Sequence, residues 1–251
     1  MSILELQNVS KSFDGTKAVD GVSLGFDQGK ITALIGPNGA GKTTVFNLIS
    51  GFLRPDEGAI SYQDKNVAGL PPWRRAQMGI GRLFQDVHLF ERMSVKDNVL
   101  AAFKNKFGES ALMSVIARRK IEKKERTHIT EALKLFDFVG LTDKANELAE
   151  NLSYGQQKLL SIARLLANGA EFLLLDEPTA GVNPQMVGAL LEIIRRLTKE
   201  GKTIAVIEHN MNIVIEIADW VYFMDEGQVV SFGLPSDVLG DPDVRRAYIG
   251  L

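Results

Sequence analysis

Apolar residues recur along this chain in two patterns, one typical of strands and one typical of helices. Residues 3–7 and 21–26 alternate apolar and polar side chains, as half-buried strands do. Residues 171–176 and 203–208 are nearly continuous apolar runs, which suit central parallel strands covered on both faces. Between those two runs, apolar side chains in residues 184–199 have the spacing of a helix. Strands and helices that alternate in this way predict an α/β fold with a mostly parallel core sheet and an antiparallel part near the N-terminus.

The pattern changes in the middle of the chain. In residues 86–167 the apolar side chains have mainly the spacing of helices, with few strand-like runs, which predicts an inserted helical subdomain. The tail returns to strands at residues 220–224 and 228–232, and the Asp-Glu-Gly turn between them predicts a hairpin. Since no internal repeat is visible, we expect one domain over the whole chain, with a core formed by residues 1–85 and 168–251.

Composition limits the class of protein. The chain has 251 residues, enough to bury a full core. No apolar run approaches the roughly 20 residues that span a bilayer, and the N-terminal residues lack the pattern of a secretory signal. The absence of cysteine excludes disulfides and thiolate metal sites. The net charge of -2 gives no general reason to expect nucleic acid binding.

The most informative stretch is residues 36–44, GPNGAGKTT, which contain the G-x-x-x-x-G-K-[ST] pattern of a phosphate-binding loop. The loop lies between a predicted strand and a predicted helix, which is the context that the pattern requires. Glycines let backbone N–H groups approach phosphate oxygens, and the following helix directs its positive end toward them. Lys42 can reach the β- and γ-phosphates, and the Thr43 hydroxyl can ligate Mg²⁺. The residues predicted to bind the phosphates are Gly36, Asn38, Gly39, Gly41, Lys42, Thr43 and Thr44.

Two adjacent acids, Asp176 and Glu177, follow a buried apolar run. Ligands bind at the carboxyl ends of strands in open α/β sheets, which is where this pair lies. Asp176 is placed to hold Mg²⁺, and Glu177 could polarise the water that attacks the γ-phosphate. The alternative is a strand-end turn with two solvated acids, and the phosphate loop upstream argues against it.

Residues 152–158, LSYGQQK, resemble the LSGGQ signature of ABC ATPases, with Tyr154 at the third position. With the loop and the acidic pair in the expected order, essentially the whole chain resembles the ATP-binding subunit of an ABC transporter. The resemblance implies that Ser153, Gly155 and Gln156 contact ATP held by a second ATPase subunit, in a homo- or heterodimer. A helix cap at Ser153 is the structural alternative, and one hydroxyl can serve both roles.

The same resemblance assigns four further residues by position. Gln85 matches the glutamine whose amide oxygen ligates Mg²⁺, and His209 matches the histidine that touches the γ-phosphate. Phe13 matches the aromatic residue that stacks on adenine, with core packing as the alternative. Val19 would back the ribose and the base. The implied catalytic residues are then Glu177 and His209, and the implied metal ligands are Thr43, Gln85 and Asp176.

Residues 179–184, TAGVNP, differ from the SALD motif that many ABC ATPases carry at this position, and Asn183 replaces its Asp. Four stretches resemble the larger ATPase subunit of branched-chain amino acid importers: TAGVNP, LSYGQQ at 152–157, EHNM at 208–211 and AYIG at 247–250. The resemblance implies import of Leu, Ile and Val with ATP and Mg²⁺, at the cytoplasmic face of the membrane. It also implies transmembrane permease subunits and, indirectly, a substrate-binding protein. Lipopolysaccharide export, urea or amide import, and a soluble non-transport ABC ATPase are the alternatives.

Two surfaces have no assigned chemistry. Residues 118–126 form the densest charge run, which predicts a solvated helix or, alternatively, a helix attracted to anionic lipid. Phe90 and Met93 follow Gln85, where the family grips a helix of the membrane subunit. Core packing is the alternative for both side chains.

Overall fold

A computed structural model describes the backbone of residues 1–104 and 118–249, and the side chains of these residues except 118–124 and 248–249. The chain divides into two compact units. The first contains Met1–Gln85, Glu171–Ala180 and Ile194–Leu251, and the second contains Asp86–Ala170 and Gly181–Ile193. The sequence predicted a core that runs without interruption from residue 168, so residues 168–170 and 181–193 differ from that expectation.

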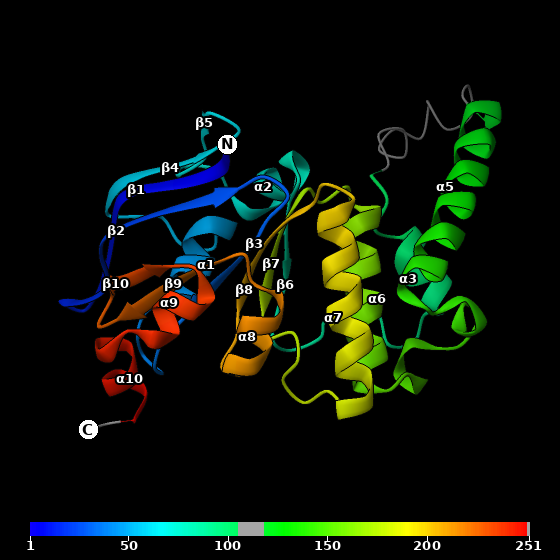
Figure 1. Cartoon of the computed structure of the whole chain (residues 1–251). Helices are drawn as coiled ribbons and strands as arrows, with labels where there is room; N and C mark the ends of the chain where they lie inside the picture. The colour runs from blue at the N-terminus through cyan, green and yellow to red at the C-terminus, as the bar shows by residue number, and fades with distance from the viewer. Residues whose placement is uncertain (105–117, 250–251) are drawn as a thin grey trace. The chain divides into compact units, whose positions relative to one another are not determined.

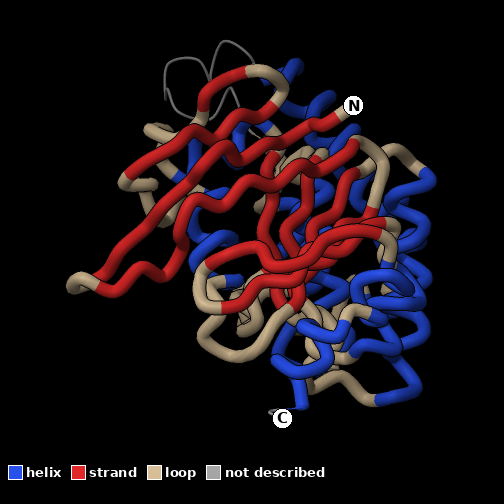
Figure 2. The backbone as a smooth tube through the Cα atoms, turned by 60° about the vertical axis from the view of Figure 1, so that its left-hand side comes forward, coloured by secondary structure: helices blue, strands red, loops and turns tan. Residues whose placement is uncertain are grey.

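The first unit contains a four-stranded antiparallel sheet, drawn among the red strands of Figure 2. Its strands, in the spatial order β2-β1-β4-β5, are β2 (Thr16–Asp27), β1 (Ser2–Phe13), β4 (Glu57–Tyr62) and β5 (Lys65–Asn66). Side chains of β1 and β2 alternate between buried and accessible positions along much of their length. The antiparallel N-terminal part that the sequence predicted is therefore confirmed.

The same unit contains a six-stranded sheet with the order β10-β9-β3-β8-β7-β6. Five strands run parallel, and β10 pairs antiparallel with β9, as the predicted hairpin requires. β3, β7 and β8 are buried at every position, which explains their continuous apolar sequences. The bounds are β3 (Ile31–Ile35), β6 (Ile80–Leu83), β7 (Phe172–Asp176), β8 (Thr203–Ile207), β9 (Trp220–Asp225) and β10 (Gln228–Gly233).

Helix α1 (Lys42–Ser50) packs in the core of this unit, and a buried arginine holds its C-terminal end. Arg75, on α2 (Pro72–Met78), is fully buried and donates to the carbonyl oxygens of Leu48 and Ile49, at 2.6 Å and 2.8 Å. A cation is favourable at this end of a helix because the last carbonyl groups lack intrahelical partners. The helices of the unit are α1 (Lys42–Ser50), α2 (Pro72–Met78), α8 (Met211–Ile217), α9 (Pro235–Gly240) and α10 (Pro242–Ile249) (Figure 1).

The second unit is mainly helical, as its sequence texture predicts. It contains α3 (Val95–Leu100), α5 (Arg118–Val139) and α6 (Tyr154–Ala167), with short 3₁₀ turns at Thr142–Lys144 and Ala149–Asn151. Helix α7 (Pro184–Lys199) begins in this unit and ends in the first. Most side chains of the charge run at 118–126 lie outside the described residues, so both interpretations of that run stay predictions.

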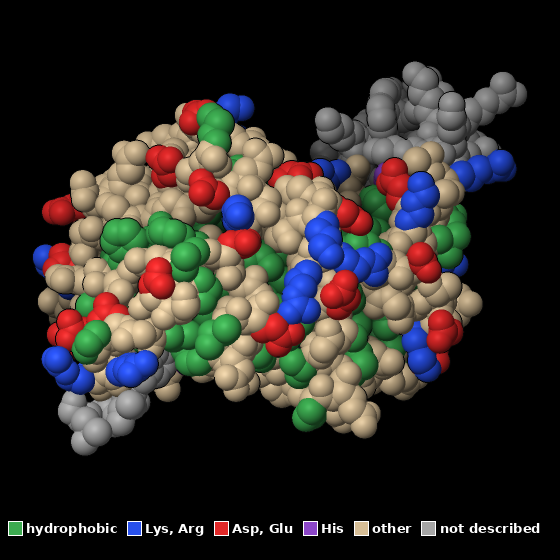
Figure 3. Space-filling view, in the orientation of Figure 1, with side chains coloured by type: hydrophobic (Ala, Val, Ile, Leu, Met, Phe, Trp, Pro, Cys, Tyr) green, Lys and Arg blue, Asp and Glu red, His purple; other side chains and the backbone are tan. Residues whose placement is uncertain are grey.

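Across the residues that the structure describes, no helix combines the length and the apolar composition needed to cross a bilayer. Acidic and basic side chains are interspersed over the face shown in Figure 3, in keeping with the small net charge.

Candidate active site

The predicted phosphate loop joins β3 to α1, and two of its positions accept only glycine. Gly36 has φ +149° and Gly41 has φ +98°. A Cβ on Gly36 would lie 2.0 Å from the carbonyl oxygen of Met224, and a Cβ on Gly41 would lie 2.2 Å from that of Ala18. The loop therefore closes against backbone on both sides, which explains why the sequence repeats glycine here.

Lys42 lies inside this loop. Its Nζ donates to the carbonyl oxygens of Gly36 and Pro37, each at 2.8 Å, and only 6% of the residue is exposed. Burial lowers the pKa of the ammonium group, while the nearby carboxylates of Glu177 and Asp176 oppose that shift. Two neutral carbonyl groups partner the charge in this structure. Phosphate oxygens would bind the ammonium more strongly, so the loop fits a nucleoside polyphosphate.

Glu177 is held between two other predicted site residues. The Oε1 atom of Glu177 lies 2.9 Å from Nε2 of His209, and its Oε2 atom accepts from the Gln85 amide at 3.2 Å. These three residues follow β7, β8 and β6, which are neighbouring parallel strands. Their carboxyl ends meet at one edge of the sheet, and that arrangement brings the side chains together. In this structure the Gln85 amide donates to a carboxylate.

A cavity of about 210 Å³ joins the loop to this cluster. Lys42 and Thr43 line it together with Glu177 and His209, so the phosphate-binding groups and the candidate base face one space. The complete lining is Ala18, Asn38, Gly39, Gly41, Lys42, Thr43, Thr44, Glu177, Ile207 and His209. Sequence reasoning missed Ala18 and Ile207, since neither carries a chemical group that a motif would reveal.

The two residues predicted to contact the base differ in accessibility. Phe13 is 43% exposed at the end of β1, with Lys11 Nζ 5.7 Å from the ring centroid, so its ring is accessible for stacking. Val19 is completely buried in the hydrophobic core, whereas its neighbour Ala18 lines the cavity. The predicted contact of Val19 with the ribose and base does not fit this burial, and Ala18 has the accessible position.

The predicted metal ligands do not form a cluster of side chains that could hold a metal ion by itself. Within the described ranges, no group of three or more His, Asp or Glu side chains could hold a metal ion. Thr43 is exposed in the cavity, and Asp176 is buried with one oxygen bonded by Arg82. Mg²⁺ usually keeps several waters and is bound by one or two carboxylates together with phosphate oxygens of the substrate. A site that offers one hydroxyl and one carboxylate suits this coordination. The donor set therefore fits Mg²⁺ carried in with a nucleotide.

Glu208 is a further residue that sequence reasoning did not assign. It is 3% exposed and accepts from the backbone N–H and the hydroxyl of Thr179, at 3.2 Å and 2.7 Å. These bonds tie the turn after Glu177 to the residue just before His209. An acid at the end of a fully apolar strand was the signal available in the sequence.

The signature residues lie in the second compact unit, at the N-terminus of α6. Ser153 Oγ accepts from the Gln156 N–H at 3.4 Å, and Gln156 Oε1 accepts from the Ser153 N–H at 3.0 Å. This reciprocal pair is a capping box, so the predicted cap at Ser153 is present. Gly155 packs closely, because a Cβ there would lie 3.2 Å from the side chain of Val182 and 3.3 Å from that of Met186. The phosphate loop belongs to the other unit.

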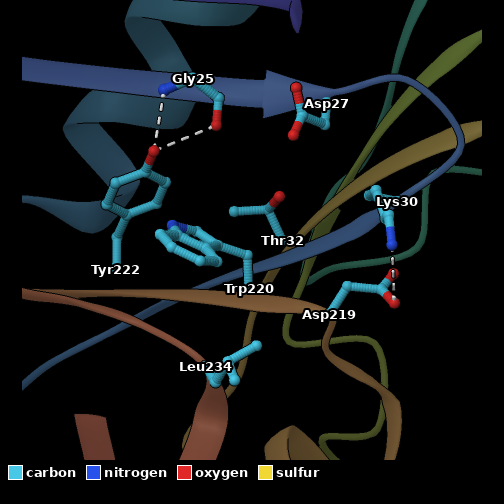
Figure 4. A pocket seen from close by; sticks show the side chains of 8 residues that line it. All are labelled: Gly25, Asp27, Lys30, Thr32, Asp219, Trp220, Tyr222 and Leu234. Carbon is cyan, nitrogen blue, oxygen red and sulfur yellow. Dashed lines mark hydrogen bonds and ion pairs between the residues drawn. The ribbon is translucent and has the colours of Figure 1, made fainter. Parts of the chain in front are cut away.

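A larger cavity, about 390 Å³, lies where β3 and β9 begin (Figure 4). The Tyr222 hydroxyl bonds the backbone of Gly25 there, and Trp220 lies below it. None of the predicted site residues lines this cavity. The chemistry-bearing groups are instead at the opposite, carboxyl ends of the strands.

Comparison with known proteins agrees with this geometry. Residues 19–180 match the ABC transporter family. The chain is 40% identical over 250 residues to the "Probable branched-chain amino acid transport ATP-binding protein LivG" of Archaeoglobus fulgidus, covering 100% of this chain and 96% of the relative. It is 38% identical over 249 residues to the "High-affinity branched-chain amino acid transport ATP-binding protein LivG" of Escherichia coli K12, covering 99% and 98%. A solved ATP-binding cassette of an ABC transporter in its ADP conformation matches with a TM-score of 0.86 at 36% identity, with both chains covered completely. The chain therefore belongs to the ABC transporter family, as the order of its motifs predicted.

Proposed function

We propose that this protein is the ATP-hydrolysing subunit of a transporter that imports branched-chain amino acids. The observation that carries the proposal is the position of Glu177, which faces the cavity of the phosphate loop while His209 and Gln85 hold its two oxygens. A carboxylate held beside a phosphate site is suited to take a proton from an attacking water. The substrate class rests on the two relatives named for branched-chain amino acid transport.

The residues of the site have different roles in hydrolysis. Lys42 and the loop N–H groups bind the β- and γ-phosphates in place of the loop carbonyls that Lys42 now contacts. Thr43, Asp176 and the amide oxygen of Gln85 would hold Mg²⁺ that enters with the nucleotide. When bound, Mg²⁺ neutralises charge on the phosphate oxygens. Glu177 accepts the proton of the attacking water, and His209 orients Glu177 and contacts the γ-phosphate.

Two further parts of the chain contact nucleotide, one on the ATP of the same subunit and one on the ATP of a second subunit. Phe13 stacks on the base, since its ring is accessible. Ser153, Gly155 and Gln156 offer an anion site at the start of α6, where N–H groups and the helix dipole favour negative charge. We infer that this anion site binds ATP carried by a second ATPase subunit, so that two subunits enclose two ATP molecules.

Partners in the membrane would contact the second unit near Phe90. Half of the Phe90 residue is exposed, and Arg164 lies 5.0 Å from its ring centroid. Asn98 bonds the backbone N–H and carbonyl of Phe90, both at 3.0 Å, and fixes the segment that carries it. Ordinary core packing does not describe a ring this exposed. Phe90 and the partly buried Met93 are therefore our proposed contacts with a permease, at the cytoplasmic face of the membrane.

Reconstitution tests the proposal. This chain would be incorporated into vesicles with the permease subunits and binding protein of a branched-chain amino acid importer, and leucine, isoleucine and valine uptake would be measured with Mg·ATP. We expect ATP-dependent uptake of these three amino acids and competition among them. Vesicles that transport urea or another amide, but none of the three, would contradict the substrate assignment and leave the ATPase assignment intact.

A further inference from the structure

A buried arginine that no motif singled out contacts the proposed metal ligand. Nη2 of Arg82, on β6, donates to Oδ2 of Asp176 at 2.9 Å, and the two side chains are only 6% and 8% exposed. Nη1 of the same guanidinium donates to Asn47 Oδ1 at 2.7 Å and to Ser50 Oγ at 3.1 Å. Asn47 and Ser50 lie on α1, the helix that begins at Lys42. One side chain thus links the carboxylate to the helix of the phosphate loop.

Aromatic contacts fix the same guanidinium further. Its central carbon lies 4.7 Å from the ring centroid of Phe84 and 5.9 Å from that of Phe46. The Nε of Arg82 is buried and makes no hydrogen bond within the described part of the chain. A buried donor left unpaired carries an energetic cost. Replacing a buried ion pair with apolar residues is often neutral or stabilising, so stability alone does not explain an arginine here.

The second oxygen of Asp176 has a different environment. Among the described residues, Oδ1 of Asp176 makes no hydrogen bond, whereas Oδ2 is fixed by Arg82. A carboxylate held through one oxygen keeps the other in a defined direction. Carboxylates that ligate metals are generally oriented by such hydrogen-bond partners, and losing a partner typically weakens metal binding about 10- to 100-fold.

We propose that Arg82 is a positioning residue for Mg²⁺. It fixes Asp176 against α1 so that the free oxygen of the carboxylate stays available to the metal that enters with the nucleotide. Arg82 acts through Asp176 and does not itself contact the nucleotide. The same strand, β6, leads to Gln85, so one element presents Gln85 to Glu177 and orients Asp176. This inference rests on the proposed function, in which Asp176 holds Mg²⁺.

The test is a titration of Mg²⁺ at fixed fluorescent ADP, paired with ADP binding in EDTA. Arg82→Met should raise the Mg²⁺ concentration for half-maximal enhancement by about 10- to 100-fold, with ADP affinity in EDTA unchanged. Arg82→Lys should require an intermediate Mg²⁺ concentration, because Lys keeps the positive charge but lacks the planar guanidinium, whose N–H groups reach both Asp176 and α1. Arg54→Met, at an exposed arginine of the same unit, controls for the loss of a positive charge.

A wild-type Mg²⁺ dependence in Arg82→Met would overturn the inference. An equal loss of ADP affinity in Mg²⁺ and in EDTA would overturn it too, because that result indicates general damage to the pocket. If Arg82→Met does not fold, Arg82→Lys and the double variant Asn47→Ala/Ser50→Ala decide, since the latter removes the α1 anchors and keeps the guanidinium. Wild-type behaviour in both would reject the role of Arg82. If the wild-type protein itself binds ADP without regard to Mg²⁺, the proposed metal role of Asp176 fails as well.

Discussion

Nε2 of His209 lies 2.9 Å from Oε1 of Glu177, although 32 positions separate the two residues along the chain. The contact exists because β7 and β8 are parallel neighbours, with Asp176 paired to Ile207. Glu177 follows β7 directly, and His209 is the second residue after the end of β8. Glu177 also has φ +46°, a backbone conformation uncommon for a residue with a side chain, and its N–H donates to the carbonyl of Ile207 at 3.0 Å. The carboxylate is thus oriented by backbone and by imidazole together.

Replacing His209 should therefore affect turnover more than binding. His209→Ala should lower kcat by about tenfold or more, less than the loss of the base itself, while the Kd for ATP changes little. Steady-state phosphate release and nucleotide titration would measure the two quantities. His88→Ala, at an exposed histidine outside the cavity, is the matched control. A variant with unchanged kcat would remove His209 from the mechanism.

Nucleotide affinity should fall at alkaline pH because of Lys42. Burial lowers the pKa of this ammonium group below 10.5 in the nucleotide-free protein, and bound phosphates would raise it again. Binding then takes up a proton above the free-protein pKa, so affinity is highest below that pKa and declines as pH rises through it. Titrations of the wild-type protein between about pH 7 and 10 would show the decline.

Substitutions at Lys42 separate this effect from others. Lys42→Ala should lose most of its affinity at every pH, because no other Lys or Arg among the described residues lines the cavity. Lys42→Arg, which stays protonated, should lose the alkaline decline even if its affinity is lower. An identical decline in the Arg variant would assign the pH dependence to another group.

Much of the site follows from sequence because its residues lie at, or just after, the carboxyl ends of strands. The phosphate loop, Asp176, Glu177 and His209 each follow an apolar run, and parallel neighbours place such residues at one edge. The side chain of Val19 illustrates where sequence reasoning fails. The pairing of β1 with β2 shifts register around Val19, and a shift of one residue exchanges the faces of a strand. Ala18 consequently lines the cavity in place of Val19.

Arg82 illustrates a second kind of failure. Its partners Asn47, Ser50 and Asp176 come from two other elements, at separations of 35, 32 and 94 residues. No local pattern contains that information. Hydrophobic periodicity predicts which strands and helices form, whereas a buried ion pair depends on how three elements meet. Only the charged residue within the β6 sequence was a visible signal.

Phe90 should matter for assembly and little for folding. Since half of Phe90 is exposed, Phe90→Ser should leave the Tm of the isolated subunit nearly unchanged. If the ring fills a groove in the permease, association should weaken by about 2 kcal/mol or more. Phe136→Ala, at a fully buried ring in the same unit, is the contrasting control and should lose about 3–5 kcal/mol of stability. A lower Tm with intact permease binding for Phe90→Ser would contradict the interface.

The anion site at α6 predicts dimerisation that depends on the Ser153 hydroxyl. Glu177→Gln, which should retain ATP, is expected to elute as a dimer in Mg·ATP and as a monomer without nucleotide. Adding Ser153→Gly should weaken that dimer, while helix stability changes by only a few tenths of a kcal/mol because Gly is a tolerated cap. Size-exclusion chromatography with light scattering would report both states. An equally stable dimer without the hydroxyl would limit Ser153 to its capping role.

Single-turnover hydrolysis of bound ATP by wild-type protein and by Glu177→Gln, in the assembled transporter, tests directly whether Glu177 is the catalytic base. The amide keeps the shape of the side chain but accepts no proton. We expect ATP binding in the wild-type range with hydrolysis slowed about 10²- to 10⁴-fold. Hydrolysis at the wild-type rate by Glu177→Gln would contradict it, because the cavity would then hold a different base.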